Sequence, residues 1–365
     1  MRTSSLRGIG PKSARWLADA GVHTRDDLQR LGAVAAFRAV QAAGFTPTLN
    51  LLWGLQGAIM DINWIDLPAV DQSAAAGRPR SAGRSNDMMI DTHTHFYDPQ
   101  RPQGIPWPPA DNELLYRTVL PQHHRELAQR EGITGTVVVE ASAWLEDNQW
   151  ILDLAADDPW IVGFVGHVDP GDGFAERLAR FSEHPLFLGI RLGGTHFEDL
   201  HSGTVLQDVE ELAKNLLALD VLVRGGQIDA VGAVARLLPE LRIVIDHIGH
   251  VPIDGGEPAA DWQDSMARTA ECRNVYCKVS AVPEQSVAQP APSGPGYYKP
   301  TLDALWRIFG EDRVVFGTNW PVSDRAAEFP AVVTIVRDYV EALGPEAAAK
   351  FWHANGRKAY RFAAG

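Results

Sequence analysis

Residues 90–95 read Ile-Asp-Thr-His-Thr-His, and this stretch decides how the rest of the chain is interpreted. It has the pattern of a short buried strand that carries polar side chains at its end. Seven further apolar runs follow it, and an amphipathic helical pattern separates each run from the next. Such alternation is typical of βα units with a parallel sheet. The expected strands span residues 89–93, 135–140, 161–167, 186–191, 219–224, 241–247, 275–279 and 313–317.

Eight strands, each followed by a helix, predict an α/β fold, a (β/α)8 TIM barrel over residues 88–365. A doubly wound open sheet is the alternative topology. It is disfavoured because no glycine-rich phosphate loop follows the first strand.

A second domain is expected before the barrel. Residues 69–87 are rich in Ala, Ser, Gly and Arg and predict a flexible linker, because they cannot bury enough apolar surface to offset their ordering entropy. Residues 1–68 have apolar stripes at helical spacing, with Thr24 as an expected N-cap. They also hold the turn Gly8-Ile9-Gly10, which opens a helix and can approach a phosphate. We expect a small all-α domain of the helix-hairpin-helix type.

The charge is divided unevenly between these parts. The net charge of the chain is −13, yet residues 1–68 hold seven basic and five acidic residues, so their net charge is +2. The acidic body argues against nucleic acid as a partner of the barrel and leaves it possible only through the N-terminal domain. No apolar run is long enough to predict a membrane span or a signal peptide, so we expect a cytoplasmic protein. The sequence leaves the oligomeric state open, and a homo-oligomer is one option. Cys272 and Cys277 are expected to be buried thiols.

Active sites of such barrels lie at the carboxyl ends of the strands. Polar residues are expected at these ends, namely His93, His95, Glu140, His167, Arg191, Arg224, Asp246, His247, Lys278 and Asn319. His93 and His95 stand two apart on one strand, so both face the interior, where they can hold a metal or polarise a carbonyl. Asp246 and His247 are adjacent, so we expect only one of them to face inward and choose His247.

The cations at these ends predict the substrate. Arg191 and Arg224 can each bind a carboxylate through two hydrogen bonds, and Lys278 is a third candidate, which indicates a small carboxylate-bearing substrate. Neutralisation of Glu140 by one of the arginines is an equally good interpretation.

Two Pro-rich loops, 96–109 and 283–300, follow the first and seventh strands. Their Trp107, Tyr297 and Tyr298 either cover an apolar part of the ligand or pack the loops down. The longer loop is a candidate lid.

Seven motifs in order carry a family resemblance: IDTHTHFYDP, VVVEAS, GHVDPG, LGIRLGG, IDHIGH, NVYCKVSA and FGTNWPVS. Through them, residues 89–362 resemble the amidohydrolase-related family of metal-dependent hydrolases, in the branch with dicarboxylate and sugar-acid lactonases. The resemblance implies hydrolysis of a carbon–oxygen or carbon–nitrogen bond at a site built on His93, His95, Arg191, His247 and the eighth-strand position. Residues 5–68 resemble the TfoX C-terminal domain family, which implies a helix-hairpin-helix-like domain associated with DNA-uptake regulators.

The eighth-strand position departs from the family. Related enzymes carry aspartate there, which binds a metal or takes the proton of the attacking water, whereas this chain has Asn319. An amide cannot act as that base, although it can donate to an oxyanion. We therefore expect either no metal or a weakly held zinc or manganese ion on His93, His95 and His247.

The predicted function is hydrolysis of a small lactone. His93, His95 and Asn319 are expected to polarise the carbonyl, and His247, or else Glu140, to deprotonate water. One alternative is a zinc-dependent decarboxylase of the same superfamily. Another is a non-catalytic, ligand-binding or regulatory barrel attached to a DNA- or protein-binding helical module.

Overall fold

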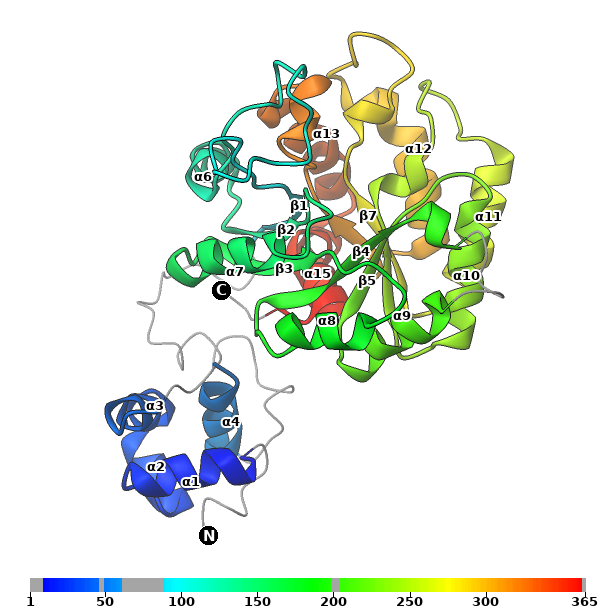
Figure 1. Ribbon diagram of the computed structural model, residues 1–365. Coiled ribbons are helices and arrows are strands. Elements are labelled where there is room, and N and C mark those ends of the chain that lie inside the picture. Colours follow the sequence, from blue (N-terminus) through cyan, green and yellow to red (C-terminus); the bar gives the residue numbers. More distant parts are fainter. Residues whose placement is uncertain (1–8, 46–48, 61–87, 198–203, 363–365) are drawn as a thin grey trace. The chain divides into compact units, whose positions relative to one another are not determined.

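The computed structural model describes residues 9–45, 49–60, 88–197 and 204–362, and the chain divides into two compact units. The larger unit, residues 87–362, contains one sheet of eight parallel strands in the order β1 to β8 (Figure 1). The strands are β1 (Ile90–Thr94), β2 (Gly135–Val139), β3 (Ile161–Gly166), β4 (Phe187–Gly193), β5 (Ala218–Leu222), β6 (Arg242–Ile245), β7 (Val275–Val279) and β8 (Val314–Phe316).

The sheet closes on itself as a barrel. Every strand pairs in parallel with the next one in the chain. Thr94 forms a parallel bridge with Trp320, and the His95 amide donates to the Trp320 carbonyl at 2.9 Å, which joins the first strand to the segment after the last. The predicted TIM barrel is confirmed.

Helices lie outside the strands because each has one apolar stripe to bury. In α8, Phe174, Leu178 and Phe181 are buried at helical spacing, while the rest of its sequence is mostly polar. The helices around the barrel are α6 (Pro121–Ala128), α7 (Asp147–Asp157), α8 (Phe174–Ser182), α9 (Val205–Lys214), α10 (Gln227–Leu237), α11 (Ala260–Ala270), α12 (Pro295–Phe309), α13 (Phe329–Ala342), α14 (Pro345–Ala349) and α15 (Asn355–Tyr360). Among the described residues, five short 3-10 turns follow strands or helices, namely η3 (Gln129–Glu131), η4 (Gly194–Phe197), η5 (His247–His250), η6 (Pro283–Gln285) and η7 (Val322–Arg325). A π-helical turn, η8 (Lys350–Ala354), precedes α15.

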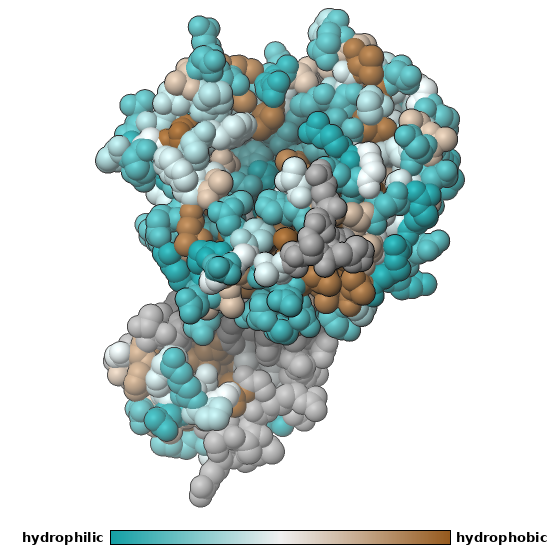
Figure 2. Space-filling view, turned by 45° about the vertical axis from the view of Figure 1, so that its right-hand side comes forward, coloured by the Kyte–Doolittle hydropathy of each residue, from teal (hydrophilic) through white to brown (hydrophobic). Residues whose placement is uncertain are grey.

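The strands are buried on both faces, as expected for a parallel barrel under a layer of helices. All five residues of β2 are buried, and its three valines divide between the barrel interior and the layer under the helices. The surface of this unit is mostly hydrophilic on the face seen in Figure 2, and it is hollowed there. Both Cys272 and Cys277 are buried free thiols, as predicted.

The smaller unit is helical, with α1 (Pro11–Asp19), α2 (Arg25–Leu31), α3 (Ala33–Ala42) and α4 (Leu49–Met60) around a core of its own. Thr24 caps α2 as predicted: its hydroxyl accepts from the Asp27 amide at 3.1 Å, and the Asp27 carboxylate accepts from the Thr24 amide at 3.1 Å. The expected linker, 69–87, and Gly8 lie outside the described residues. Across the described helices, none is long and apolar enough to cross a membrane.

Candidate active site

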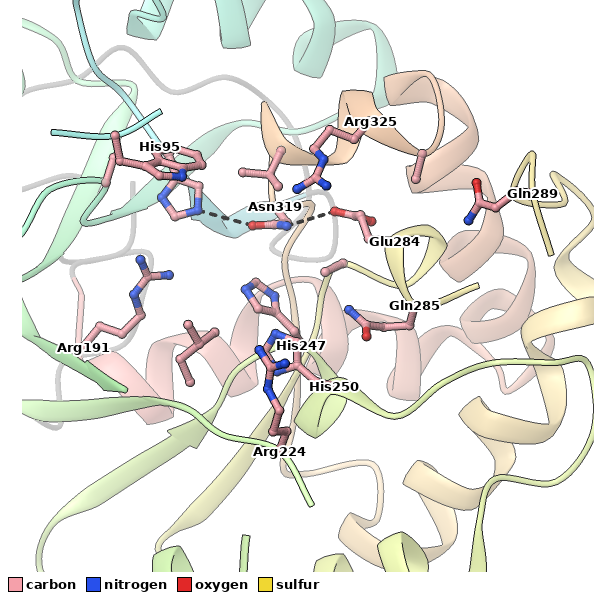
Figure 3. Close-up of a pocket in the computed structure, with 16 residues that line it drawn as sticks. His95, Arg191, Arg224, His247, His250, Glu284, Gln285, Gln289, Asn319 and Arg325 are labelled. Carbon is pink, nitrogen blue, oxygen red and sulfur yellow. Dashed lines mark hydrogen bonds between the residues drawn. The ribbon is translucent and has the colours of Figure 1, made fainter. Parts of the chain in front are cut away.

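A pocket of about 830 Å³ opens at the carboxyl ends of the strands (Figure 3). The residues that line it come from the ends of seven of the eight strands or the segments that follow them, β3 being the exception. They are His95, Trp107, Ala141, Arg191, Leu222, Arg224, His247, His250, Ala281, Glu284, Gln285, Gln289, Asn319, Val322, Arg325 and Ala326.

The backbone is strained around this pocket. His247, His250, Ala281 and Asn319 line it and have left-handed backbone angles, with φ values of 53°, 53°, 52° and 65°. Such conformations are unfavourable for residues other than glycine and concentrate at functional sites. At Asn319 the turn is held by hydrogen bonds, since its amide donates to the His93 carbonyl at 2.8 Å and its own carbonyl accepts from Ser323 at 3.1 Å. These turns direct polar side chains into the pocket.

His95, Asn319 and Glu284 lie in a row along the pocket wall (Figure 3). His95 Nε2 is 3.3 Å from Asn319 Oδ1, and Asn319 Nδ2 donates to Glu284 Oε1 at 2.9 Å. On its other side, His95 Nδ1 lies 3.0 Å from the carbonyl oxygen of Val139. Burial lowers the pKa of His95 to about 4 and raises the pKa of Glu284 to about 7. Glu284 was not among the residues predicted from the sequence, although it follows the seventh strand closely.

Lys278 lies in a buried cluster of charges. Its Nζ atom is 2.6 Å from Asp220 Oδ2, 3.0 Å from Asp246 Oδ1 and 3.1 Å from His93 Nδ1. The Tyr360 hydroxyl, from α15, donates to Asp220 at 2.7 Å. Lys278 is 0% exposed and does not line the pocket, so the expectation that it contacts substrate is corrected.

The two carboxylates of this cluster differ in their acidity. Burial raises the pKa of Asp220 to about 7, although the Lys278 ammonium opposes this shift. Burial also disfavours the charged form of Asp246, but Lys278 and the neighbouring His247 and Arg191 hold the pKa of Asp246 below its usual value. The cluster is therefore built around the single ammonium of Lys278.

Asp246 and His247 both face the interior, which corrects the expectation that only one of them would. β6 ends at Ile245, and the left-handed turn at His247 brings its ring to a centroid distance of 4.5 Å from His93. Asp246 Oδ1 is 3.4 Å from His93 Nδ1, and His247 Nδ1 is 2.8 Å from Ser280 Oγ.

These residues fit a metal ion. His93, Asp246 and His247 each offer a ligand atom, and these atoms lie within 4.8 Å of one another. His93 Nε2 is buried without a hydrogen-bond partner among the described residues. This set differs from the expected metal ligands, because it includes Asp246 and excludes His95, whose Nε2 atom contacts Asn319. Since the ammonium of Lys278 already contacts Asp246 and His93, it would weaken the binding of a second cation.

Asp91 joins the first strand to the segment after the eighth. Its carboxylate accepts from the backbone amides of His93 at 3.1 Å and Thr318 at 2.9 Å, and it lies 3.2 Å from His124 Nε2. It therefore fixes the residues next to His95 and Asn319. This role of Asp91 was not predicted from the sequence.

The arginines divide into two kinds. Arg191 Nε donates to Glu140 Oε1 at 2.8 Å and Arg191 Nη2 donates to the Glu140 carbonyl at 2.8 Å, which is the neutralisation considered from the sequence. Arg224 also lines the pocket, together with Arg325, which the sequence analysis missed. In the part of the chain that the structure describes, neither Arg224 nor Arg325 forms an ion pair with a side chain.

The remaining expected residues have separate places. Trp107 lines the pocket with its ring centroid 6.0 Å from that of His95. Tyr297 does not line the pocket; its hydroxyl donates to the Ile253 carbonyl at 2.8 Å, so it packs its loop down. His167 lies outside the pocket and contacts Asp169 at 2.9 Å.

Residues 90–362 match the family model described as amidohydrolase. The chain belongs to the amidohydrolase family. This amidohydrolase is 33% identical to a protein named L-fucono-1,5-lactonase from Burkholderia ambifaria over 282 residues, which cover 75% of this chain and 96% of that protein. A protein of the same name from Burkholderia multivorans is 26% identical over 290 residues, which cover 75% and 96%.

Solved structures agree with this assignment. An amidohydrolase from Burkholderia multivorans, crystallised with bound zinc, is 26% identical, with a TM-score of 0.66 and coverage of 75% of this chain and 99% of that one. Residues 1–74 match the model of the TfoX C-terminal domain. Both predicted resemblances and the hydrolase class are confirmed.

Proposed function

We propose that this amidohydrolase hydrolyses the 1,5-lactone of a sugar acid, or a related lactone that bears a carboxylate. The observation that carries the proposal is a pocket lined by His95, Asn319 and two arginines, Arg224 and Arg325, neither of which forms an ion pair with a side chain among the described residues. The lactonase name of two relatives, each of which matches 75% of this chain, supports the reaction. These names favour lactone hydrolysis over the decarboxylase alternative.

The polar residues of the pocket suit an ester carbonyl. Asn319 is 5% exposed and lies against the pocket, where the second hydrogen of its amide nitrogen can donate to the oxygen that becomes negative on attack. His95 contacts the Asn319 amide and holds it in this place. Arg224 and Arg325 bind the carboxylate of the substrate, or the carboxylate that opening of any lactone produces. His93 is 0% exposed, so it acts from behind His95 rather than by contact with substrate.

His93, Asp246 and His247 are the residues that would hold a divalent metal, zinc or manganese. A metal bound there supplies Lewis-acid polarisation of the carbonyl or a water of lowered pKa. The zinc in the Burkholderia multivorans structure supports this part of the proposal. Metal content after purification and after chelation, compared between the wild type and His93→Ala, measures it without reference to activity.

The test of function is a panel of neutral and carboxylate-bearing lactones, followed with a pH indicator, for the purified, chelated and metal-loaded protein. We expect turnover that Asn319→Ala and His95→Ala reduce without a change in melting temperature. The absence of turnover under every condition, with zinc and with manganese, would refute lactone hydrolysis.

We also propose that residues 1–68 form a separate module joined by a linker over 69–87, in a cytoplasmic protein. The module's match to the TfoX C-terminal domain supports a role in binding nucleic acid or protein. Titration of the full chain with duplex DNA at two salt concentrations tests the first, because phosphate contacts weaken steeply with salt. Size-exclusion chromatography with light scattering measures whether the protein is a homo-oligomer.

A further inference from the structure

We propose that Glu284 deprotonates the attacking water and then protonates the leaving oxygen, in place of the aspartate that Asn319 replaces. The inference rests on the proposed lactone hydrolysis and assigns its proton transfer to one residue.

The position of Glu284 is the first argument. It lies in η6, just after β7, and lines the pocket beside Asn319 (Figure 3). Its Oε1 atom accepts from Asn319 Nδ2 at 2.9 Å, so its carboxylate is one hydrogen bond away from the position that related enzymes give to aspartate. Its Oε2 atom is buried and has no hydrogen-bond partner among the described residues. An enclosed carboxylate oxygen at a pocket requires a water or substrate hydrogen as its partner.

The hydrogen-bond row provides the second argument. The Val139 carbonyl can only accept, so His95 Nδ1 carries a proton. If Nε2 carries a second proton, it donates to Asn319 Oδ1, and the Asn319 amide then donates to an ionised Glu284. If Nε2 carries none, the Asn319 amide must turn over, and its oxygen then faces Glu284, which must supply the proton. In either arrangement, His95 and Glu284 share one proton through the Asn319 amide. Glu284 is the one whose free oxygen can exchange this proton with the pocket.

The reaction balances with this one proton. A water oxygen forms a bond to the lactone carbonyl carbon as Glu284 Oε2 takes one of the water's protons, and the carbonyl electron pair moves to oxygen beside His95 and Asn319. The tetrahedral intermediate then re-forms the carbonyl, and the ring carbon–oxygen bond breaks. The departing alkoxide takes the proton from Glu284, which returns to its carboxylate form. The product is an open-chain hydroxy acid, whose carboxyl proton passes to solvent.

The bases expected from the sequence are placed less well. Glu140 does not line the pocket, and Arg191 binds both its side chain and its carbonyl. His247 has Nδ1 against Ser280, and it belongs to the group that fits a metal, in which a ligand nitrogen cannot also accept a proton. Burial also raises the pKa of Glu284 to about 7, a value suited to a base that works near neutral pH.

The test is Glu284→Gln, with the exposed Glu240→Gln as the matched control. Glutamine keeps an oxygen that accepts from Asn319, so the melting temperature should stay within a few degrees of the wild type. We expect kcat to fall by about 100-fold or more, with little change in KM, because general acid–base catalysis contributes on this scale. The rise of kcat/KM through about pH 7 in the wild type should disappear in Glu284→Gln. The control should match the wild type.

Rescue separates proton transfer from packing. The double variant Glu284→Gln with Asn319→Asp returns a carboxylate to the eighth-strand position and should regain at least tenfold of the lost rate. Formate, a small carboxylate, should raise the rate of Glu284→Ala in proportion to its concentration and leave Glu240→Ala unchanged. Formate rescue of Glu284→Ala keeps the proposal testable if Glu284→Gln folds poorly.

The outcomes are distinct. A wild type that opens lactones and a Glu284→Gln variant within threefold of its kcat would overturn this assignment and leave the proposed function in place. A loss that appears in KM alone, or one that neither carboxylate restores, would make Glu284 a binding or packing residue and would also overturn the assignment. A wild type without lactone turnover would defeat the proposed function and this inference with it.

Discussion

Replacement of Lys278 by methionine is expected to destabilise the barrel by about 3–5 kcal/mol at pH 8, the scale for removing one partner of a buried ion cluster. The ammonium lies 2.6 Å from Asp220 and 3.0 Å from Asp246, and all three side chains are 0% exposed. Methionine is similar in length and apolar, so packing is largely kept and the loss reflects two carboxylates left without their cation.

The loss should depend on pH. Burial already raises the pKa of Asp220 to about 7, against about 3.9 in an unfolded chain. A raised folded pKa means that the contribution of the group to stability is fully present below the unfolded pKa and is lost as pH rises through the folded pKa. Without Lys278 the pKa of Asp220 rises further and the pKa of Asp246 is no longer held down by the ammonium, so the destabilisation should be larger at pH 8 than at pH 5.

Urea unfolding, followed by tryptophan fluorescence at both pH values, measures this difference. Lys299→Met is the control, because Lys299 is 61% exposed and pairs with Asp303 on the surface of α12, where such a pair contributes about 0.5 kcal/mol or less. A loss for Lys278→Met below about 1 kcal/mol, or the same loss at pH 5 and pH 8, would refute the account of the buried cluster.

Three further changes test other parts of the molecule. Arg325→Met should raise KM for a carboxylate-bearing lactone by about 10–100-fold, because the substitution removes a charge-assisted hydrogen bond whose free energy corresponds to a factor of this size. Steady-state kinetics with a neutral lactone of the same ring supply the control. An equal rise in KM for both lactones would contradict a carboxylate-binding role. Gly317→Ala should lower kcat at least tenfold and the unfolding free energy by about 1–3 kcal/mol. The reason is steric, because the new Cβ would lie 2.7 Å from His93 Cβ and 3.2 Å from the His93 amide nitrogen. Gly294→Ala is the control, because its new Cβ would have no neighbour within 4 Å. If both alanine variants behave alike, β1 and β8 are not in the close contact described. Thr24→Ala should cost the N-terminal unit about 1 kcal/mol through loss of the helix cap, seen as faster amide exchange in α2 with the barrel amides unchanged; unchanged exchange in α2 would show that the cap contributes little.

The fold could be predicted because each barrel strand is a short apolar run with a helical pattern after it. The expected strand over residues 275–279 coincides with β7. The ends of β5 and β6 could not be predicted. Arg224 and His247 were expected to be the last residues of these strands, but each lies two residues after the observed end of its strand. A strand ends where its neighbour's hydrogen bonds end, and at His247 the backbone adopts a left-handed turn that local sequence does not reveal.

The site was predictable where one segment carries the signal. His95 stands beside the pocket as the spacing of the two histidines implied, and Arg191 adopts one of its two expected pairings. Glu284 was missed because its significance comes from Asn319, which is 35 residues away along the chain. Asp220 was likewise hidden within an apolar strand, and only the three-dimensional contact with Lys278 shows why a carboxylate lies there.

The hydroxyl of Tyr360 beneath the site has a consequence for the order of synthesis. Asp220, on β5, receives this hydroxyl at 2.7 Å from α15, and the Ala359 carbonyl in the same helix accepts from the Arg242 guanidinium of β6 at 2.7 Å. When the middle of the barrel leaves the ribosome, these partners have not yet been translated. A nascent chain that stops before residue 359 must therefore solvate or protonate Asp220 in some other way. The polar floor of the barrel can be completed only when the last helix arrives, so ribosome-bound chains shorter than this should remain sensitive to protease in the barrel.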